Sequence, residues 1–281
     1  MSTQEPSSAN SSAPERLPNG KLTWQRSGKV AWLTLTNPPA NGYSYEMMRD
    51  LDEAILRARF DVEIEVIVIA GAGEKFFCAG ADISMLHGVT QQFKYAFCLH
   101  ANETLRRLEE TPKLAIAAIG GHCVGGGLEV ALACDLRIAR RGSGKCGLPE
   151  VSLGVLPGTG GTQRLARNVG SARAIELMAS GRLMEYEEAL SLGIVQQVLD
   201  SPDDASFNAA VLAYAQSFTS PAKAALSVGH IKRAVIGGAD LSLDAGLALE
   251  RELQAKLFAS EDAREGIAAY VEKRKPRFRG R

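Results

Sequence analysis

Short apolar runs of strand length recur through the first half of the chain. Residues 21–27 and 30–36 are rich in β-branched and aromatic side chains and flank Gly28-Lys29, which predicts two strands joined by a turn. Residues 66–70 and 114–119 are almost entirely apolar and are bounded by turn-forming residues. They predict strands that are buried on both faces, as in a parallel sheet.

Segments with helical spacing separate these runs. Residues 45–60 carry apolar side chains three and four positions apart, and residues 91–109 and 128–135 also favour helix. Residues 71–80 are expected to form a loop. Alternation of short strands with helices is typical of parallel βαβ-type units, so we expect an α/β fold.

The second half of the chain is mainly helical, apart from a strand-like segment at residues 194–199. Leu249, Leu253 and Leu257 follow one another at intervals of four and form an apolar stripe. This stripe must be buried, either on the chain's own core or against another subunit. The expected helices span residues 162–168, 172–179, 186–192, 203–219, 221–236, 241–259 and 261–275.

The two ends differ in composition from the body. Residues 1–19 have few apolar side chains and no h-region of a secretory signal, so we expect a disordered tail. Residues 20–200 then form the main core and residues 201–281 a C-terminal helical region. Six of the last nine residues are basic. Three interpretations are open for this segment: a solvated tail, a contact with a phosphate group, or a contact with RNA. The last is the weakest, because Phe278 is the only aromatic ring in the segment that could stack on RNA bases.

Composition narrows the classes of function. The 281 residues include 32 basic and 32 acidic side chains, so the chain has no net charge to attract nucleic acid or a membrane surface. No apolar run reaches the roughly 20 residues that span a bilayer. The five cysteines have no CxxC spacing, and they suit a reducing, cytoplasmic compartment better than disulfides or zinc.

The strongest chemical signal is Gly125-Gly-Gly-Leu-Glu129, which joins the strand at 114–119 to the helix at 128–135. Three glycines permit a sharp turn and expose peptide N–H groups at the positive end of the helix dipole, where a developing oxyanion is stabilised. Glu129 lies in the first helical turn among apolar neighbours. An acidic residue there can simply favour the helix N-terminus, but burial of its carboxylate is costly.

A second glutamate, Glu150, occurs in a similar setting within Leu148-Pro-Glu-Val-Ser-Leu153. Two carboxylates beside an oxyanion-binding turn would form a general acid/base pair. Burial and mutual repulsion would raise one of their two pKa values. Whether the two glutamates meet depends on the fold.

Other chemical motifs are absent or incomplete. Gly71-Ala-Gly73 follows a strand, but the third glycine of a dinucleotide fingerprint is missing. His100 and His122 have no second ligand at metal-binding spacing, so we expect no metal site. Cys123 and Cys146 have no evident base paired with them and are expected to be core thiols.

Several motifs together resemble the crotonase (enoyl-CoA hydratase/isomerase) superfamily, and they occur in the family's order from about Lys21 to the C-terminus. The resemblance implies a spiral of repeated ββα units followed by a C-terminal helical trimerisation region. The motifs are Glu74-Lys-Phe-Phe-Cys-Ala-Gly-Ala-Asp-Ile83, Gly125-Gly-Gly-Leu-Glu129, Cys134-Asp135, Pro149-Glu150 and Leu156-Pro-Gly-Thr-Gly-Gly-Thr-Gln-Arg-Leu165.

The resemblance also implies an enoyl-CoA hydratase, which adds water across the 2,3 double bond of a 2-enoyl-CoA thioester without a separate cofactor. It implies that Glu129 and Glu150 orient the water and that Glu150 exchanges a proton with C2. It assigns the backbone N–H groups of Ala81 and Gly126 to an oxyanion hole. Isomerases of the family often keep only the equivalent of Glu150, so an isomerase, decarboxylase or hydrolase that uses Glu150 alone is the alternative.

The same resemblance assigns further residues to substrate and CoA binding, some of them across subunits of a homotrimer or homohexamer. It implies an acyl pocket shaped by residues 85–90, in which His87 is a possible polar contact. Leu148 replaces a Gln of some hydratases, Ser84 replaces a common Lys, and an extra residue separates the glutamates. The sequence therefore does not determine which acyl group the substrate carries. The CoA-binding residues would be Ala40, Ala79, Asp82, Ile83, Tyr270 and Lys273.

Overall fold

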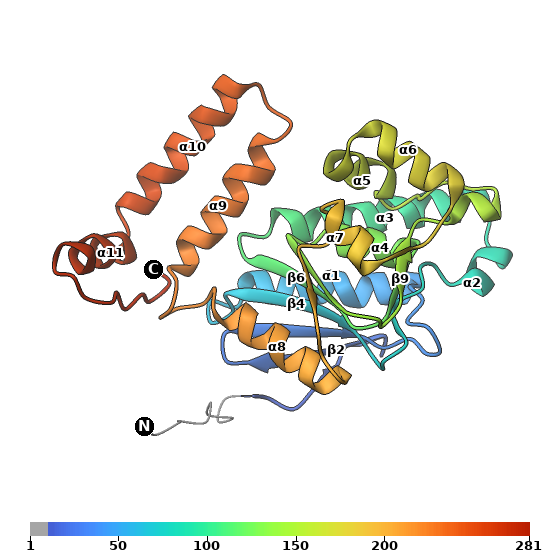
Figure 1. Ribbon diagram of the computed structural model, residues 1–281, viewed down its shortest axis with the longest axis horizontal. Coiled ribbons are helices and arrows are strands. Elements are labelled where there is room, and N and C mark those ends of the chain that lie inside the picture. The colour runs from blue at the N-terminus through green and yellow to red at the C-terminus, as the bar shows by residue number, and fades with distance from the viewer. Residues whose placement is uncertain (1–10) are drawn as a thin grey trace.

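A seven-stranded, mostly parallel sheet forms the centre of the computed structural model, which describes residues 11–281 (Figure 1). The strand order is β1-β2-β3-β4-β6-β8-β11. The first three strands are antiparallel neighbours, and all later neighbours pair in parallel. The strands are β1 (Glu15–Arg16), β2 (Leu22–Ser27), β3 (Val30–Leu35), β4 (Val66–Gly71), β6 (Leu114–Ile119), β8 (Leu136–Arg140) and β11 (Gln197–Leu199).

A second sheet has four short strands in the order β10-β9-β7-β5. Strands of two or three residues leave no periodic signal in a sequence, so this sheet was not expected, and the loop expected at 71–80 contains β5. The strands are β5 (Phe76–Cys78), β7 (His122–Val124), β9 (Lys145–Gly147) and β10 (Met184–Glu185).

The two sheets are built from a repeated unit. A strand of the large sheet is followed by a strand of the small sheet and then by one or more helices, in the successions β4-β5-α2-α3, β6-β7-α4 and β8-β9-η1-α5. The chain therefore winds between the two sheets as the expected spiral of ββα units. Each passage from the small sheet to a helix lies near the site described below.

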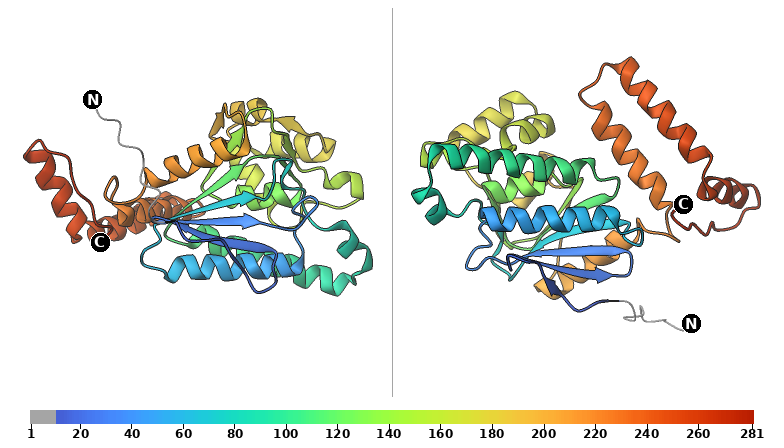
Figure 2. Two further views of the ribbon diagram at one scale, coloured as in Figure 1. Left: turned by 90° about the horizontal axis from the view of Figure 1, so that it is seen from below. Right: turned by 180° about the vertical axis from the view of Figure 1, so that it is seen from behind.

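Helices cover both faces of the large sheet, α1 and α3 on one and α8 on the other (Figures 1 and 2). Alternate residues of β4 serve the two sides, because successive strand side chains point to opposite faces. Ile67 and Ile69 join the core that includes α1, whereas Val66 and Val68 pack with Phe207 of α8.

No helix within residues 11–281 is long and apolar enough to cross a membrane. The helices are α1 (Tyr45–Phe60), α2 (Ile83–Gly88), α3 (Gln91–Glu110), α4 (Gly126–Leu132), the 3₁₀ helix η1 (Glu150–Leu153), α5 (Gly161–Val169), α6 (Ser171–Ser180), α7 (Tyr186–Ser191), α8 (Asp204–Gln216), α9 (Ala225–Gly238), α10 (Leu243–Phe258) and α11 (Glu261–Val271).

The disordered tail expected over residues 1–19 is wrong for its second half. Residues 1–10 lie outside the described part of the chain, but Glu15–Arg16 pairs with β2 and Leu17 is buried in the main core. The free edge of β2 supplies the backbone partners that order this segment. An exposed two-residue strand with a single apolar neighbour has no pattern that a sequence analysis could detect.

The C-terminal helices α9, α10 and α11 extend beyond the edge of the sheet (Figures 1 and 2). A buried lysine attaches α9 to the body. The ammonium of Lys232 lies 2.8 Å from Asp135 Oδ2 and donates to the carbonyl groups of Leu108 and Lys113. Asp135 also accepts a hydrogen bond from Ala115 N at 2.7 Å, so one charged pair ties together α9, β6 and the ends of α3 and α4.

The apolar stripe of α10 lies against neighbouring helices of the same chain. Leu253 is buried, Leu249 and Leu257 are partly buried, and α10 packs along α9 with Leu249 beside Gly237. The stripe therefore packs on the chain's own helices. A different set of apolar side chains on these helices is exposed, namely Ile231, Val235, Leu243, Leu247 and Phe258.

We expect Lys232→Met to destabilise the protein by about 3–5 kcal/mol, because it leaves the carboxylate of Asp135 buried without a counter-charge. Urea unfolding followed by circular dichroism measures the change. Lys232→Met combined with Asp135→Asn should recover much of the loss, and Lys256→Met, at an exposed position of α10, should change little. Equal stability of Lys232→Met and Lys256→Met would contradict the anchoring role of the pair.

Candidate active site

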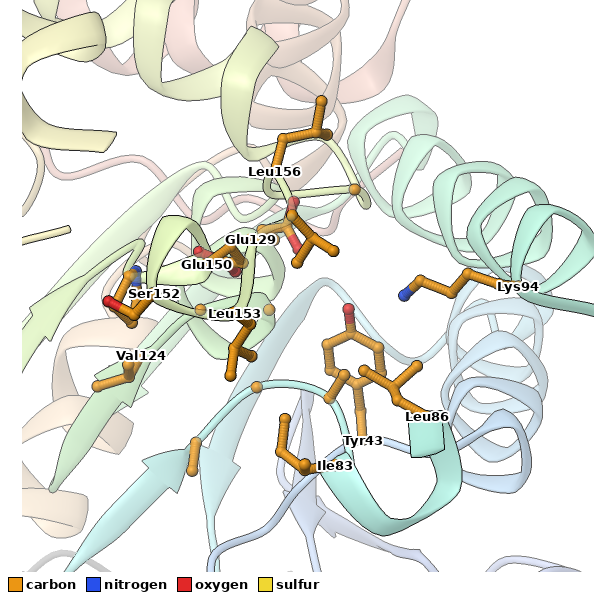
Figure 3. A pocket seen from close by; sticks show the side chains of 18 of the residues that line it. Tyr43, Ile83, Leu86, Lys94, Val124, Glu129, Glu150, Ser152, Leu153 and Leu156 are labelled. Atoms are coloured by element: carbon orange, nitrogen blue, oxygen red, sulfur yellow. The ribbon is translucent and has the colours of Figure 1, made fainter. Parts of the chain in front are cut away.

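The residues expected to carry the chemistry line one cavity of about 540 Å³ (Figure 3). Its walls come from the loop before α1, from residues 79–94, from the start of α4 and from residues 149–158. The lining is mainly apolar, but Glu129 and Glu150 from two different repeats both face it. The fold therefore brings together the two carboxylates that the sequence could not place.

Two residues that line the cavity, Ala81 and Gly126, have backbone N–H groups that donate to no acceptor in the described part of the chain. Tyr43 pairs with the segment at Ala81 so that Tyr43 N donates to Gly80 O and Asp82 N donates to Tyr43 O. This pattern bypasses the N–H group of Ala81. Gly126 begins α4, and its N–H group, like that of Ala81, donates to no acceptor within residues 11–281.

The glycines at this turn are required by close packing. A Cβ atom on Gly80, whose φ is +90°, would lie 3.0 Å from Gly126 N. A Cβ atom on Gly126 would lie 1.8 Å from a ring carbon of Tyr43, and one on Gly127 would lie 2.0 Å from the Cys78 carbonyl oxygen. The two strand-to-helix passages thus touch through their backbones, and both contribute residues to the wall of the cavity.

Glu129 is almost fully buried, with 1% of its surface exposed, and three donors converge on its carboxylate. Its Oε1 accepts from Thr159 N at 2.8 Å and from Gly161 N at 2.7 Å, and its Oε2 accepts from the Thr159 hydroxyl. A Cβ atom on Gly161 would lie 3.0 Å from Oε1, so glycine permits this approach. Three donors satisfy an ionised, acceptor-only carboxylate.

Glu150 has the opposite environment. It begins η1, and its Oε1 lies 3.0 Å from the place that a Cβ atom on Gly125 would occupy. Its Oε2 is buried and accepts no hydrogen bond from the described residues. Burial, assisted by the negative charge of Glu129, raises the pKa of Glu150 to about 7, whereas a hydrogen bond from its own backbone N–H and the Lys94 ammonium oppose this rise. Glu150 is therefore the carboxyl group that holds a proton near neutral pH.

Comparison with known proteins shows the family to which the chain belongs. The model of the family described as enoyl-CoA hydratase/isomerase matches residues 25–281. The chain belongs to the enoyl-CoA hydratase/isomerase family. It is an enzyme of this family, and both the resemblance and the crotonase fold inferred from its motifs are confirmed.

Similar proteins cover nearly the whole chain. A probable enoyl-CoA hydratase of Bacillus subtilis is 39% identical over 252 residues, which cover 89% of this chain and 95% of the relative. An (E)-benzylidenesuccinyl-CoA hydratase of Thauera aromatica is 38% identical over 92% of this chain and 99% of its own. A solved enoyl-CoA hydratase structure from Geobacillus kaustophilus has a TM-score of 0.90 and 40% identity, and the match covers 97% of this chain and 99% of that one.

The remaining residues assigned to CoA binding divide into two groups. Ala79 and Ile83 line the cavity; Ala40 lies beside it, where its carbonyl accepts from Ala79 N at 3.0 Å. Asp82 caps α2 instead, with Oδ1 accepting from Met85 N at 3.3 Å. The loop thus serves both as the capped start of α2 and as a wall of the hydratase/isomerase site.

Tyr270 and Lys273 do not reach the cavity of their own chain. Tyr270 is exposed on α11, at the opposite end of the molecule from α2, and Lys273 follows just after this helix (Figure 1). The basic tail beyond them folds back, since Arg274 forms ion pairs with Glu265 and Glu272. The pair with Arg274 lowers the pKa of Glu265 to about 2.

Residues 85–90, expected to shape the acyl pocket, contribute Leu86, Val89 and Thr90 to the cavity, whereas His87 is exposed and outside it. The side chain of Ser84 lies outside the described part of the structure. In the described residues no group of three or more His, Cys, Asp or Glu side chains could hold a metal ion.

Sequence reasoning missed three polar contributors to the hydratase/isomerase site: Tyr43, Lys94 and Thr159. Tyr43 precedes α1 and Lys94 lies within α3, and both point into the cavity (Figure 3). Thr159, in the loop before α5, holds Glu129. Thr159 lay within a recognised motif, but no local pattern linked it or the other two to a carboxylate far away in sequence.

We expect Glu150 to titrate with a midpoint near pH 7. Glu129→Gln should lower this midpoint because it removes a negative neighbour, and Lys94→Met should raise it because it removes a positive one. Carbon-13 NMR of glutamate carboxyl groups measures both shifts, and Glu150→Gln identifies the signal. A midpoint near the ordinary 4.5 in the unmodified protein would contradict the assignment of Glu150 as the proton carrier.

Proposed function

We propose that this chain is an enoyl-CoA hydratase that adds water across the 2,3 double bond of a 2-enoyl-CoA thioester. The observation that carries the proposal is the pairing of unlike carboxyl groups in one cavity. Glu129 is held by donors that suit the ionised form, and the pKa of Glu150 is raised to about 7. Beside them, the free N–H groups of Ala81 and Gly126 suit a thioester oxygen.

Hydration places negative charge on the thioester oxygen when water attacks C3. The N–H groups of Ala81 and Gly126 receive this oxygen, and loss of one such donor typically costs about 10²–10³ in rate. Glycine at one position and alanine at the other leave room for the thioester to approach the backbone. Both donors are main-chain groups, so they stay in place when side chains change.

The carboxyl groups then divide the proton transfers. Both orient the water, Glu129 accepts a proton from it as its oxygen bonds to C3, and protonated Glu150 delivers a proton to C2. The thioester carbonyl re-forms as the C2–H bond forms, so the reaction consumes water and leaves no net proton. Each acid/base contribution is worth roughly 10²–10⁴ in rate.

An isomerase that uses Glu150 alone is the second candidate, because moving a double bond needs one group that shuttles a proton. Glu129 argues against it. The Glu129 carboxylate is only 1% exposed and is held by three donors. Burying it is costly, and a pure isomerase would have no role for it.

The proposed reaction needs no cofactor beyond the CoA of its substrate, since the carboxyl pair and the oxyanion donors supply every step. We also propose a cytoplasmic location. All five cysteines are free, and four of them, Cys78, Cys123, Cys134 and Cys146, are buried, which suits a reducing compartment.

We propose, further, a homotrimer or a dimer of trimers in which the C-terminal helices meet a neighbouring subunit. Ile231, Val235, Leu243, Leu247 and Phe258 are exposed on α9 and α10, an apolar surface that a second copy of the chain would cover. Tyr270 and Lys273 lie far from their own cavity. In such an assembly they would contact CoA bound to the adjacent subunit.

The division of labour predicts different losses for the two glutamates. Glu129→Gln should lower the rate of crotonyl-CoA hydration by about 10²–10⁴ yet leave some solvent exchange at C2, whereas Glu150→Gln should lose both activities. Loss of enoyl absorbance and deuterium incorporation measure them. Binding of a CoA ester should persist in both variants, and their effects should not add. Normal hydration by Glu129→Gln would favour the isomerase.

The proposed assembly predicts a trimer or hexamer by light scattering at micromolar concentration. Lys273→Met should raise KM for enoyl-CoA with little change in kcat, because its ammonium would contact the CoA moiety. Lys275→Met, two residues further along the exposed tail, is the matched control. A fully active monomer would rule out a shared CoA site.

A further inference from the structure

We propose that Tyr43 is a positioning residue that acts through Thr159 to fix the carboxylate of Glu129 for the attack of water. The inference rests on the proposed hydratase function. It concerns a chain of three side chains, Tyr43, Thr159 and Glu129, that come from the loop before α1, the loop before α5 and the first turn of α4.

The direction of the two hydrogen bonds follows from their chemistry. The Thr159 hydroxyl donates to Glu129 Oε2, and the Tyr43 hydroxyl oxygen lies 3.1 Å from Thr159 Oγ1. A hydroxyl has one proton to donate, and Thr159 gives its proton to the carboxylate. Tyr43 is therefore the donor to Thr159, and the chain runs from Tyr43 through Thr159 to Glu129.

All three groups are removed from water, which strengthens the chain. Tyr43, Thr159 and Glu129 are exposed by 3%, 1% and 1%. Hydrogen bonds in a low-dielectric interior polarise one another, so a donor to Thr159 makes Thr159 a better donor to Glu129. Burial, and then the charge of Glu129, raises the pKa of Tyr43 well above its usual value, so the phenol keeps its proton over the working pH range.

This hydrogen-bond chain determines how many acceptor positions of the Glu129 carboxylate remain available to water. A carboxylate has about four acceptor positions. Thr159 N and Gly161 N occupy two at Oε1, and the Thr159 hydroxyl occupies one at Oε2. The remaining position at Oε2 is the one left for the attacking water. The hydrogen-bond chain thus keeps the carboxylate from rotating and leaves one basic lone pair for the reaction.

Tyr43 also contacts the other half of the site. Its backbone pairs with the segment at Ala81, and its ring packs against Gly126. Replacement of Tyr43 by Phe keeps these contacts and the ring stacking near Phe97, at 5.7 Å between centroids, and removes only the hydroxyl. The substitution therefore separates positioning of Glu129 from support of the oxyanion donors.

We expect Tyr43→Phe to lower kcat for crotonyl-CoA hydration about 10-fold with KM nearly unchanged, and Thr159→Val to lower it about 10–100-fold. Thr159→Ser keeps the hydroxyl and should retain most activity. The effects of Tyr43→Phe and Thr159→Val should not add, because both break one chain. Tyr45→Phe, at a neighbouring half-exposed ring outside the cavity, is the matched control and should match the unmodified protein.

The pH profile supplies a readout that a purely structural role would not move. The titratable groups that act on Tyr43 are Glu129, Cys78 and Cys98, and those that act on the neighbouring Glu150 are Glu129 and Lys94; none of them changes in Tyr43→Phe. Thr159 donates to the ionised form of the carboxylate, and weaker donation stabilises that form less. The acidic limb of the kcat/KM profile should therefore move to higher pH in Tyr43→Phe and stay in place in Tyr45→Phe.

Two results would overturn the proposal: a Tyr43→Phe enzyme with unchanged kcat and pH profile, or full activity of Thr159→Val. If the unmodified protein hydrates no enoyl-CoA, the proposed function fails separately. Carbon-13 NMR then still tests the hydrogen-bond chain, because loss of the Tyr43 hydroxyl must change the chemical shift of the Glu129 carboxyl carbon. An unchanged chemical shift would rule out the hydrogen-bond chain whatever the reaction.

Discussion

The site depends on one constraint, the burial of a carboxylate at the start of α4. An uncompensated carboxylate in such a place is strongly unfavourable, so the surroundings must provide donors. The loop before α5 supplies two peptide N–H groups and a hydroxyl to Glu129. This requirement accounts for Gly161, whose missing Cβ admits the oxygen, and for Thr159, whose hydroxyl completes the set.

The same constraint links separate repeats of the fold. Gly126 starts α4, and its lack of a side chain makes room for the ring of Tyr43, which precedes α1. Tyr43 in turn pairs with the segment at Ala81 between β5 and α2. The carboxylate, the ring and the two free N–H groups therefore form one packed unit. A change at any of the contacts would shift the others, since packed interiors transmit strain.

Much of the fold was evident in the sequence, because long periodic segments carry strong signals. The helix expected at residues 45–60 is α1 with the same bounds, and the helices from residue 203 onward correspond to α8–α11. The small sheet and the strand at Glu15–Arg16 were missed, because two or three residues hold no period. The stripe of Leu249, Leu253 and Leu257 was recognised, but the sequence could not decide that α9 covers it.

The candidate site was partly predictable for a related reason. Glu129, Glu150 and Gly126 belong to local motifs, whereas the contact of Tyr43 with Thr159 joins residues 116 positions apart. Long-range hydrogen bonds of this kind leave no trace in a single sequence. The sequence likewise could not show that the two glutamates have unequal environments. A raised pKa was expected for one glutamate, but only the fold shows that Glu150 Oε2 accepts no hydrogen bond from the described residues while the Glu129 carboxylate accepts three.

This inequality gives the pair its chemical direction. Two equivalent carboxyl groups would share one proton without preference, and neither would be a reliable base. Here the donors stabilise charge on Glu129, and burial disfavours charge on Glu150, so a proton shared by the pair favours Glu150. Lys94 acts against this bias, since its ammonium lowers the pKa of Glu150. The cavity therefore keeps the pKa of Glu150 close to neutral pH. In the proposed hydration, such a group gives a proton to C2 and takes one back with little free-energy difference.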